Sequence, residues 1–207
     1  LALHNPHARN ILRLLEAYVT GSGLSVALQS RRSETDADLL AAAEHLWVQF
    51  VEHNAAHYSA REHARRAWRD GECFVRKFPS AAWPPAVRFV DPEAIGATAD
   101  APDSQGILTA ADDVESPRAY LRIDPGSGRL VERIGAEEML HTRHGVDSNQ
   151  KRGVTVFLPI LHVLDCFNKW IETELLARKL QSSIVLWRKV QGSPQQAAAF
   201  ADGLAGG

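Results

Sequence analysis

The sequence predicts an α+β fold: a helical N-terminal part, a small antiparallel β region and one long helix after it. Three observations support this prediction. Capped segments with helical periodicity fill the first third of the chain, and short β-like runs separated by Pro and Gly follow them. The third observation is the stretch from Pro159 to Lys189, which contains no Gly or Pro after its first residue. As a helix with ~1.5 Å rise per residue it would be about 45 Å long.

Capping signals mark the helices of the first third. Asn5 and Pro6 are typical of an N-cap and a first helical residue. Ser59 and Glu62 have the spacing of a capping box, and Gly71 can end the helix that this box opens. The predicted helices cover residues 7–20, 36–54 and 60–70, and residues 24–29 alternate weakly enough to be a candidate strand.

The middle of the chain reads as strands and turns. The predicted strands cover residues 72–78, 86–90, 119–123, 129–134 and 139–142. Residues 97–117 are small, acidic and poorly patterned, which predicts a loop. The tail from Gly192 is rich in Ala, Gln and Gly, and we expect it to be frayed.

Composition sets limits on the protein but says little about its identity. The net charge of −2 gives no global field that would hold DNA or an anionic membrane. Two cysteines far apart in the sequence, Cys73 and Cys166, favour free thiols in a reducing compartment. No apolar run approaches the ~18 residues of a membrane span, and no signal sequence is evident at the N-terminus.

The apolar stripe of the long helix changes side along its length. The first half places its apolar residues on one face, and the second half places them roughly half a turn away. A helix that meets two partners in succession would need such a pattern; a core helix broken near Thr173 is the alternative. The candidate residues for packing on the chain's own body are Leu164, Phe167 and Ile171. The candidate subunit-interface residues are Leu176, Leu180, Ile184 and Trp187.

No residue of the chain is assigned a catalytic, cofactor-binding or metal-binding role. His53 and His57 have the spacing of two zinc ligands on one helical face, but Asn54 stands where a metalloprotease has its general base. No glycine-rich phosphate loop, nucleophile elbow or Cys-x-x-Cys pair is present. Four arginines of the third helix, Arg61, Arg65, Arg66 and Arg69, are expected to form a solvated face that pairs with Glu62 and Asp70.

A series of short motifs resembles the lambda-type portal proteins of tailed phages. In chain order they are Asn-Pro-His-Ala-Arg-Asn at 5–10 with Gly-Ser-Gly-Leu at 21–24, Asp-Gly-Glu-Cys-Phe-Val at 70–75, Val-Asp-Pro-Glu at 90–93, Met-Leu-His at 139–141, Gln-Lys-Arg-Gly-Val at 150–154 and Leu-Pro-Ile-Leu at 158–161. Each motif is modest by itself, but their order along the chain makes the resemblance specific.

The resemblance implies a structural subunit of a phage or prophage portal, not an enzyme, and no cofactor. Residues 1–152 would be the wing, residues 153–190 the first stem helix, and residues 191–207 the start of a clip that the chain does not complete. The implied partners are further copies in a dodecameric ring, DNA passing through its channel without sequence specificity, terminase, the head–tail adaptor and capsid proteins. The implied location is the portal vertex of the virion, after assembly in the cytoplasm of a host bacterium.

Two other functions remain open from the sequence alone. One is a metal-dependent hydrolase that uses His53 and His57, and the other is a helical adaptor or interaction protein unrelated to phage.

Overall fold

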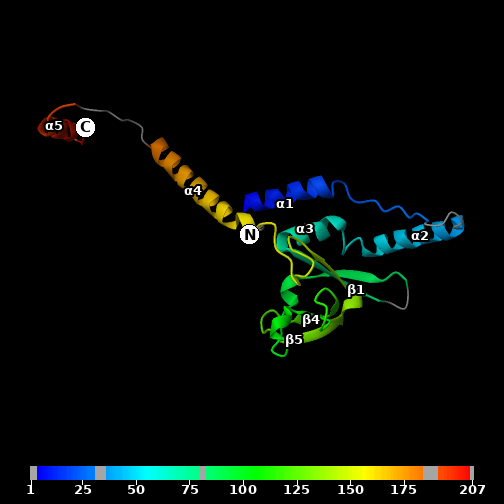
Figure 1. Cartoon of the computed structure of the whole chain (residues 1–207). Helices are drawn as coiled ribbons and strands as arrows, with labels where there is room; N and C mark the ends of the chain where they lie inside the picture. Colours follow the sequence, from blue (N-terminus) through cyan, green and yellow to red (C-terminus); the bar gives the residue numbers. More distant parts are fainter. Residues whose placement is uncertain (1–3, 31–35, 80–82, 184–190, 206–207) are drawn as a thin grey trace. The chain divides into compact units, whose positions relative to one another are not determined.

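The computed structural model describes residues 4–30, 36–79, 83–183 and 191–205 (Figure 1). The chain separates into two compact units, Leu1–Leu161 and His162–Gly207. The first unit holds three helices and both sheets, and the second holds two helices, which confirms the α+β class.

The three N-terminal helices begin and end close to the predicted residues. They are α1 (Pro6–Val19), α2 (Ala37–Asn54) and α3 (Ala60–Asp70). The Asn5 side chain accepts hydrogen bonds from two backbone amides of the first turn of α1, and Ser59 accepts one from the amide of Glu62. Gly71 ends α3 in the left-handed region at φ 88°, which a residue without a Cβ adopts readily. The capping signals therefore predicted these ends correctly.

Two antiparallel sheets of three strands follow. The first has the order β2-β1-β6, from β1 (Glu72–Phe78), β2 (Ala86–Val90) and β6 (Met139–Arg143). The second has the order β3-β4-β5, from β3 (Ile107–Thr109), β4 (Pro117–Ile123) and β5 (Leu130–Gly135). Short 3-10 turns η1 (Pro92–Ala94), η2 (Pro102–Ser104) and η3 (Ala136–Glu138) connect them.

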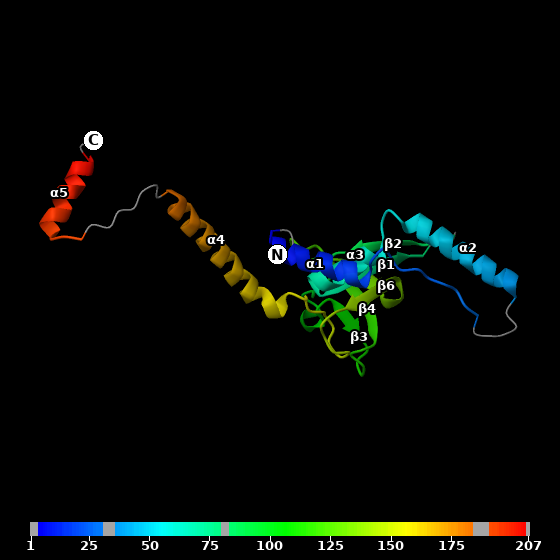
Figure 2. The same cartoon turned by 90° about the horizontal axis from the view of Figure 1, so that it is seen from above.

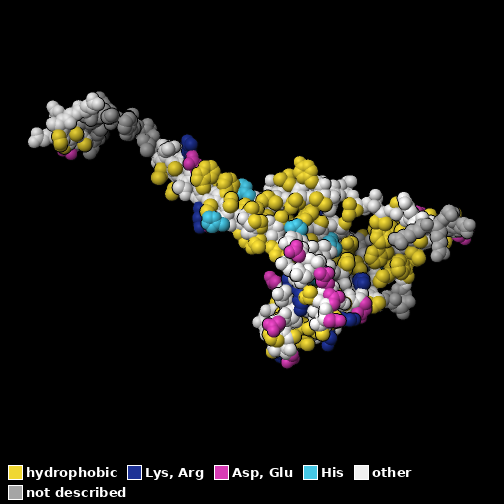
Figure 3. Space-filling model, viewed as in Figure 1, with side chains coloured by type: hydrophobic (Ala, Val, Ile, Leu, Met, Phe, Trp, Pro, Cys, Tyr) yellow, Lys and Arg dark blue, Asp and Glu magenta, His cyan; other side chains and the backbone are white. Residues whose placement is uncertain are grey.

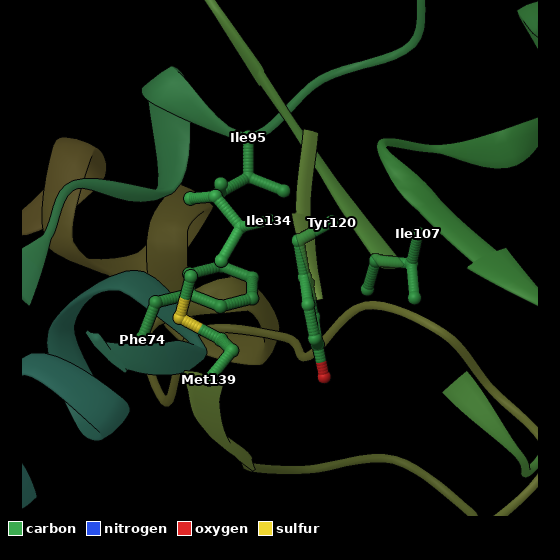
Figure 4. Packing of buried hydrophobic residues seen from close by; sticks show 6 residues of the cluster. All are labelled: Phe74, Ile95, Ile107, Tyr120, Ile134 and Met139. Carbon is green, nitrogen blue, oxygen red and sulfur yellow. The ribbon is translucent and has the colours of Figure 1, made fainter. Parts of the chain in front are cut away.

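The main core lies between the two sheets. Its buried residues come from both sheets and from the end of η1. They are Phe74, Ile95, Ile107, Tyr120, Ile134 and Met139 (Figure 4). The opposite face of β1 carries Cys73 and Val75, which pack with Ala67 of α3. Because side chains alternate along a strand, β1 is buried on both faces, with α3 on one side and the second sheet on the other.

The second unit begins within the long helix. A 3-10 turn η4 (Leu158–Ile160) leads into α4 (Leu161–Ser183), which passes Thr173 without interruption. A break near Thr173, the alternative raised by the stripe, is therefore absent. Of the predicted interface residues, Ile184 and Trp187 lie outside the described residues. None of the described helices combines the length and apolar character that a membrane span requires.

Three expectations were wrong. Residues 24–29 form no strand; within the described residues, no strand pairs with them. The segment 97–117 is not a simple loop, because Ile107 pairs with Tyr120 and starts β3. Residues 194–205 are not frayed but form α5 (Pro194–Ala205), whose start is a capping box in which Ser193 and Gln196 exchange hydrogen bonds.

Candidate functional site

The polar centre of the first unit is Glu72, the first residue of β1. Its side chain is only 4% exposed and points to the same side of the sheet as Phe74. Arg152 donates to Glu72 through Nε at 2.8 Å and also through Nη2, so the pair is bidentate. The amide of Gly153 and the ring of His141 complete the carboxylate's partners at 3.3 and 3.1 Å. A buried carboxylate with this set of donors has its charge fully compensated.

Arg152 also joins segments that are distant in the sequence. Its guanidinium donates to the carbonyl oxygens of Ile95, Gln105 and Pro92, at 2.8, 2.9 and 3.1 Å. The guanidinium carbon lies 5.5 Å from the centre of the Phe74 ring. One side chain therefore fixes β1, both turns before β3 and the segment that leads to α4.

His141 is held as a packed aromatic ring. It stacks on Phe74, with ring centres 4.1 Å apart and planes 18° from parallel, and it meets Tyr120 edge-on at 5.8 Å. The ring thus continues the core between the sheets while its Nε2 reaches Glu72. We name Glu72, His141, Arg152 and Gly153 the Glu72 cluster.

The Glu72 cluster determines the protonation of its carboxylate. Burial alone would raise the pKa of Glu72, but the hydrogen bonds from His141 and Arg152, the charge of Arg152 and the Gly153 amide together lower it below its ordinary value. Glu72 is therefore ionised and fully paired, which is the state of a structural carboxylate and not of a general acid.

Three segments of backbone lie against one another beside this cluster, at Gly71, His144 and Val154. The amide of His144 donates to the carbonyl of Gly71 at 2.8 Å, and the amide of Val154 donates to the carbonyl of His144 at the same distance. A Cβ on Gly71 would lie 2.6 Å from the amide nitrogen of Thr155, closer than real Cβ contacts allow. The glycine at position 71 is therefore required both by its positive φ and by this close approach.

The segment before α4 also caps α3. The carbonyls of Trp68 and Arg69, in the last turn of α3, accept hydrogen bonds from the Thr155 hydroxyl at 3.2 and 2.7 Å. The amide of Val156 donates to the Trp68 carbonyl at 3.0 Å. Carbonyl groups at the C-terminus of a helix have no hydrogen-bond donor within the helix, and Thr155 and Val156 supply donors for those of α3. Thr155 and Val156 are thereby fixed to the end of α3, within the first unit, by side chains and backbone together.

The arginines of α3 confirm the expectation of ion pairing. Arg66 contacts Glu62 at 2.9 Å and Asp91 at 2.8 Å, and Arg69 contacts Asp70 at 2.6 Å. The other two reach further: Arg65 lies 3.6 Å from Glu16 of α1, and Arg61 donates to the carbonyl of Gly21. Arg61 and Arg65 join α1 and the turn after it to α3. Arg66 joins the residue after β2 to α3, whereas Arg69 pairs within α3.

The histidine pair does not form a metal site in the described part of the chain. No group of three His, Cys, Asp or Glu side chains there is placed to bind a metal ion. Helix α2 ends at Asn54, so His57 lies beyond the helical face that carries His53. Asn54 itself is buried and structural: its amide group donates to the carbonyls of Phe50 and Pro85 and accepts from the amide of Val87.

The candidate residues of the long helix differ in exposure. Leu164 is buried and Ile171 is half-buried, whereas Phe167 is 40% exposed and stacks on Trp170 with ring centres 5.7 Å apart. Leu176 and Leu180 are exposed. The pairs Asp165–Lys169 and Glu174–Arg178 join consecutive turns of the helix, so several of its charged groups are satisfied within α4.

The sequence motifs meet in the Glu72 cluster, which the sequence alone did not indicate. Glu72 belongs to the motif at 70–75, His141 to that at 139–141 and Arg152 to that at 150–154. The motif at 90–93 contributes the carbonyl of Pro92. A buried acidic residue at the start of an apolar strand was the available signal, because such a charge requires a partner elsewhere.

Only one cysteine is expected to react in the folded protein. Burial is the main cause that raises the pKa of the Cys73 thiol to about 12, whereas Cys166 is exposed and both thiols are free. Because the thiolate is the reactive form, a maleimide at pH 7.5 should add one label per native chain and two after unfolding in denaturant. Intact mass measures this directly. Two labels on the native chain, or none, would contradict the described burial.

The fold and its polar cluster define a class of protein. An α+β body, a buried charge cluster without a reactive group and a helix with exposed apolar side chains are features of a subunit that assembles with others. The sequence profile described as "Phage portal protein, lambda family" matches residues 1–205, and the chain belongs to this family of structural virion proteins, which form an oligomeric ring at the capsid vertex. No curated protein matches the chain.

Proposed function

We propose that this chain is a structural subunit of the portal ring, in which it helps to form the channel that DNA enters during packaging and leaves during ejection. The proposal rests on the family and on α4. The distal half of that helix carries Leu176 and Leu180, both at least 58% exposed. Exposed apolar residues at helical spacing mark an interface, and neighbouring copies in a ring would cover them.

The charge of the chain is compatible with a conduit. A protein that neutralises many phosphates binds DNA tightly and releases it slowly, which would impede sliding. The net charge of −2 and the ion-paired arginines of α3 leave no broad basic surface on that helix. DNA would therefore pass without sequence-specific contacts.

The proposed division is the one that the sequence motifs predict. Residues 1–152 would be the wing, residues 153–190 the first stem helix, and residues 191–207 the beginning of the clip. The ring would be dodecameric, and terminase, the head–tail adaptor and capsid proteins would bind it. Assembly would take place in the cytoplasm of the host bacterium. The chain would catalyse no reaction and need no cofactor.

The two alternative functions receive no support. Family membership is incompatible with a helical adaptor unrelated to phage. A hydrolase based on His53 and His57 would need a third ligand, and the described residues place none beside them.

Electron microscopy of the purified full-length protein tests the proposal. We expect closed rings with a central channel. Leu180→Ser should reduce the fraction of rings while leaving the melting temperature of the unassembled subunit within about 1 °C, because the side chain is exposed in the single chain. The neighbouring exposed residue provides a matched control, Lys179→Ala, which should leave assembly unchanged. A protein that stays monomeric at tens of micromolar would refute the ring.

A further inference from the structure

Among the described residues, the side-chain contacts that join α2 to the rest of the first unit come from its C-terminal end. Asn54, its last residue, is the anchor through hydrogen bonds to Pro85 and Val87, and Phe50 lies one turn before it, with its ring 6.4 Å from Trp83. The remaining turns carry an apolar stripe at intervals of three and four residues. Its exposed large members are Leu39, Leu46, Trp47 and Val51.

The charges of α2 are of one sign. Asp38, Glu44 and Glu52 are acidic, and the helix contains no Lys or Arg. By helical periodicity Glu44 borders the apolar stripe. Two copies of α2 packed on one another through this stripe would bring their Glu44 carboxylates together without a compensating cation, which costs free energy. Asp38 and Glu52 lie on the other side of the helix. The charge pattern therefore favours a different surface as the partner of α2.

Helix α1 presents a surface of the matching kind. Its inner face, with Ala8 and Leu12, is buried, and α1 packs on α3. Its outer face exposes Leu14 and Tyr18, the latter to 87%. Arg13 lies roughly 100° round the helix from Leu14, on the side away from Tyr18. An apolar ridge with a basic residue to one side is complementary to an apolar stripe with an acidic residue beside it.

We propose that the apolar stripe of α2 in one copy packs on the outer face of α1 in the next copy. Figures 1 and 2 show α1 beside α3 and α2 at another side of the first unit, and Figure 3 shows apolar side chains over both helices. A contact between two different faces is heterologous, so it repeats from copy to copy and closes into a ring when the rotation allows. The inference rests on the proposed ring and identifies a second interface in it, separate from α4.

Cysteine cross-linking in the assembled full-length protein tests this contact. The background is Cys166→Ser, because Cys73 is buried. Tyr18→Cys and Leu46→Cys place thiols on the two faces. A mixture of the two single variants should give cross-linked dimers on oxidation, each single variant alone should give none, and the double variant should give a ladder of covalent multimers. The matched control is Ala41→Cys, on the opposite side of α2 from the stripe, which should abolish the ladder in combination with Tyr18→Cys.

Each outcome decides between the two proposals. Rings without a Tyr18–Leu46 cross-link would overturn this contact and leave the proposed function intact. Dimers from Leu46→Cys alone would show that α2 pairs with itself, which also overturns it. Cross-linked multimers without rings in the microscope would support the contact and refute the channel. Neither rings nor cross-links would refute both.

Discussion

Replacing Arg152 with alanine is expected to lower the free energy of unfolding of the first unit by about 3–5 kcal/mol at neutral pH. The change leaves the Glu72 carboxylate buried without its main cation and removes the donors to three backbone carbonyls. Arg152→Lys should recover only part of the loss, because an ammonium group cannot make the bidentate pair and reach those carbonyls together. Chemical denaturation followed by circular dichroism measures both variants.

A surface arginine provides the matched control. Arg122 faces Glu132 at 3.4 Å and is 45% exposed, so Arg122→Ala should cost less than about 1 kcal/mol. An equal cost for Arg122→Ala and Arg152→Ala would show that burial of the Glu72 cluster contributes nothing particular.

The pH dependence of the same variants carries a definite sign. The pKa of Glu72 is lowered in the folded state, so its contribution to stability is present above the ordinary pKa of 4.5 and is lost as the pH falls through the folded value. Protonated Glu72 needs no cation. The difference in stability between wild type and Arg152→Ala should therefore shrink below about pH 4.5. A difference that stayed constant down to pH 3 would show that the carboxylate is not the reason for the loss.

Gly71→Ala is expected to have the second large effect on stability. The new methyl group would meet the backbone at Val154 and Thr155, and the residue would have to keep φ at 88°. A left-handed conformation alone costs roughly 1–2 kcal/mol for a residue with a Cβ. The clash with backbone atoms cannot be relieved by a rotamer change, so we expect a total loss of more than about 3 kcal/mol.

Gly128→Ala separates the two causes of that loss. Gly128 also has a positive φ, 67°, but a Cβ there would meet nothing within 4 Å. Its replacement should cost only the conformational part. Equal losses at positions 71 and 128, measured by denaturant unfolding, would mean that the close approach of Gly71 to the segment before α4 is unimportant.

The sequence predicted local structure well wherever a single residue type determines the backbone. Asn5, Ser59 and Gly71 gave the ends of α1 and α3, since caps act on neighbouring amides and carbonyls. The Ala-, Gln- and Gly-rich composition of the tail predicted a frayed end, whereas Ser193 and Gln196 form a capping box that starts α5.

Long-range pairing was the part that the sequence did not reveal. Strand β3 has three residues and depends on β4 for its pairing, so residues 107–109 carry too little periodicity to be recognised. The Glu72 cluster was missed for a related reason. Each of its residues lies in a different short motif. Nothing in the sequence of one motif indicates which distant residue its side chain will contact.

The pairing of Glu72 with Arg152 has a consequence for synthesis of the chain. The two residues are 80 positions apart, and closing a loop of that length costs on the order of 4 kcal/mol of chain entropy. A ribosome makes residues in order, so β1 emerges with an acidic residue at its start long before the balancing cation exists. The buried Glu72 cluster of the first unit can therefore form only after Arg152, in the segment leading into α4, has emerged from the ribosome. The start of the long helix is therefore the final part that the body needs.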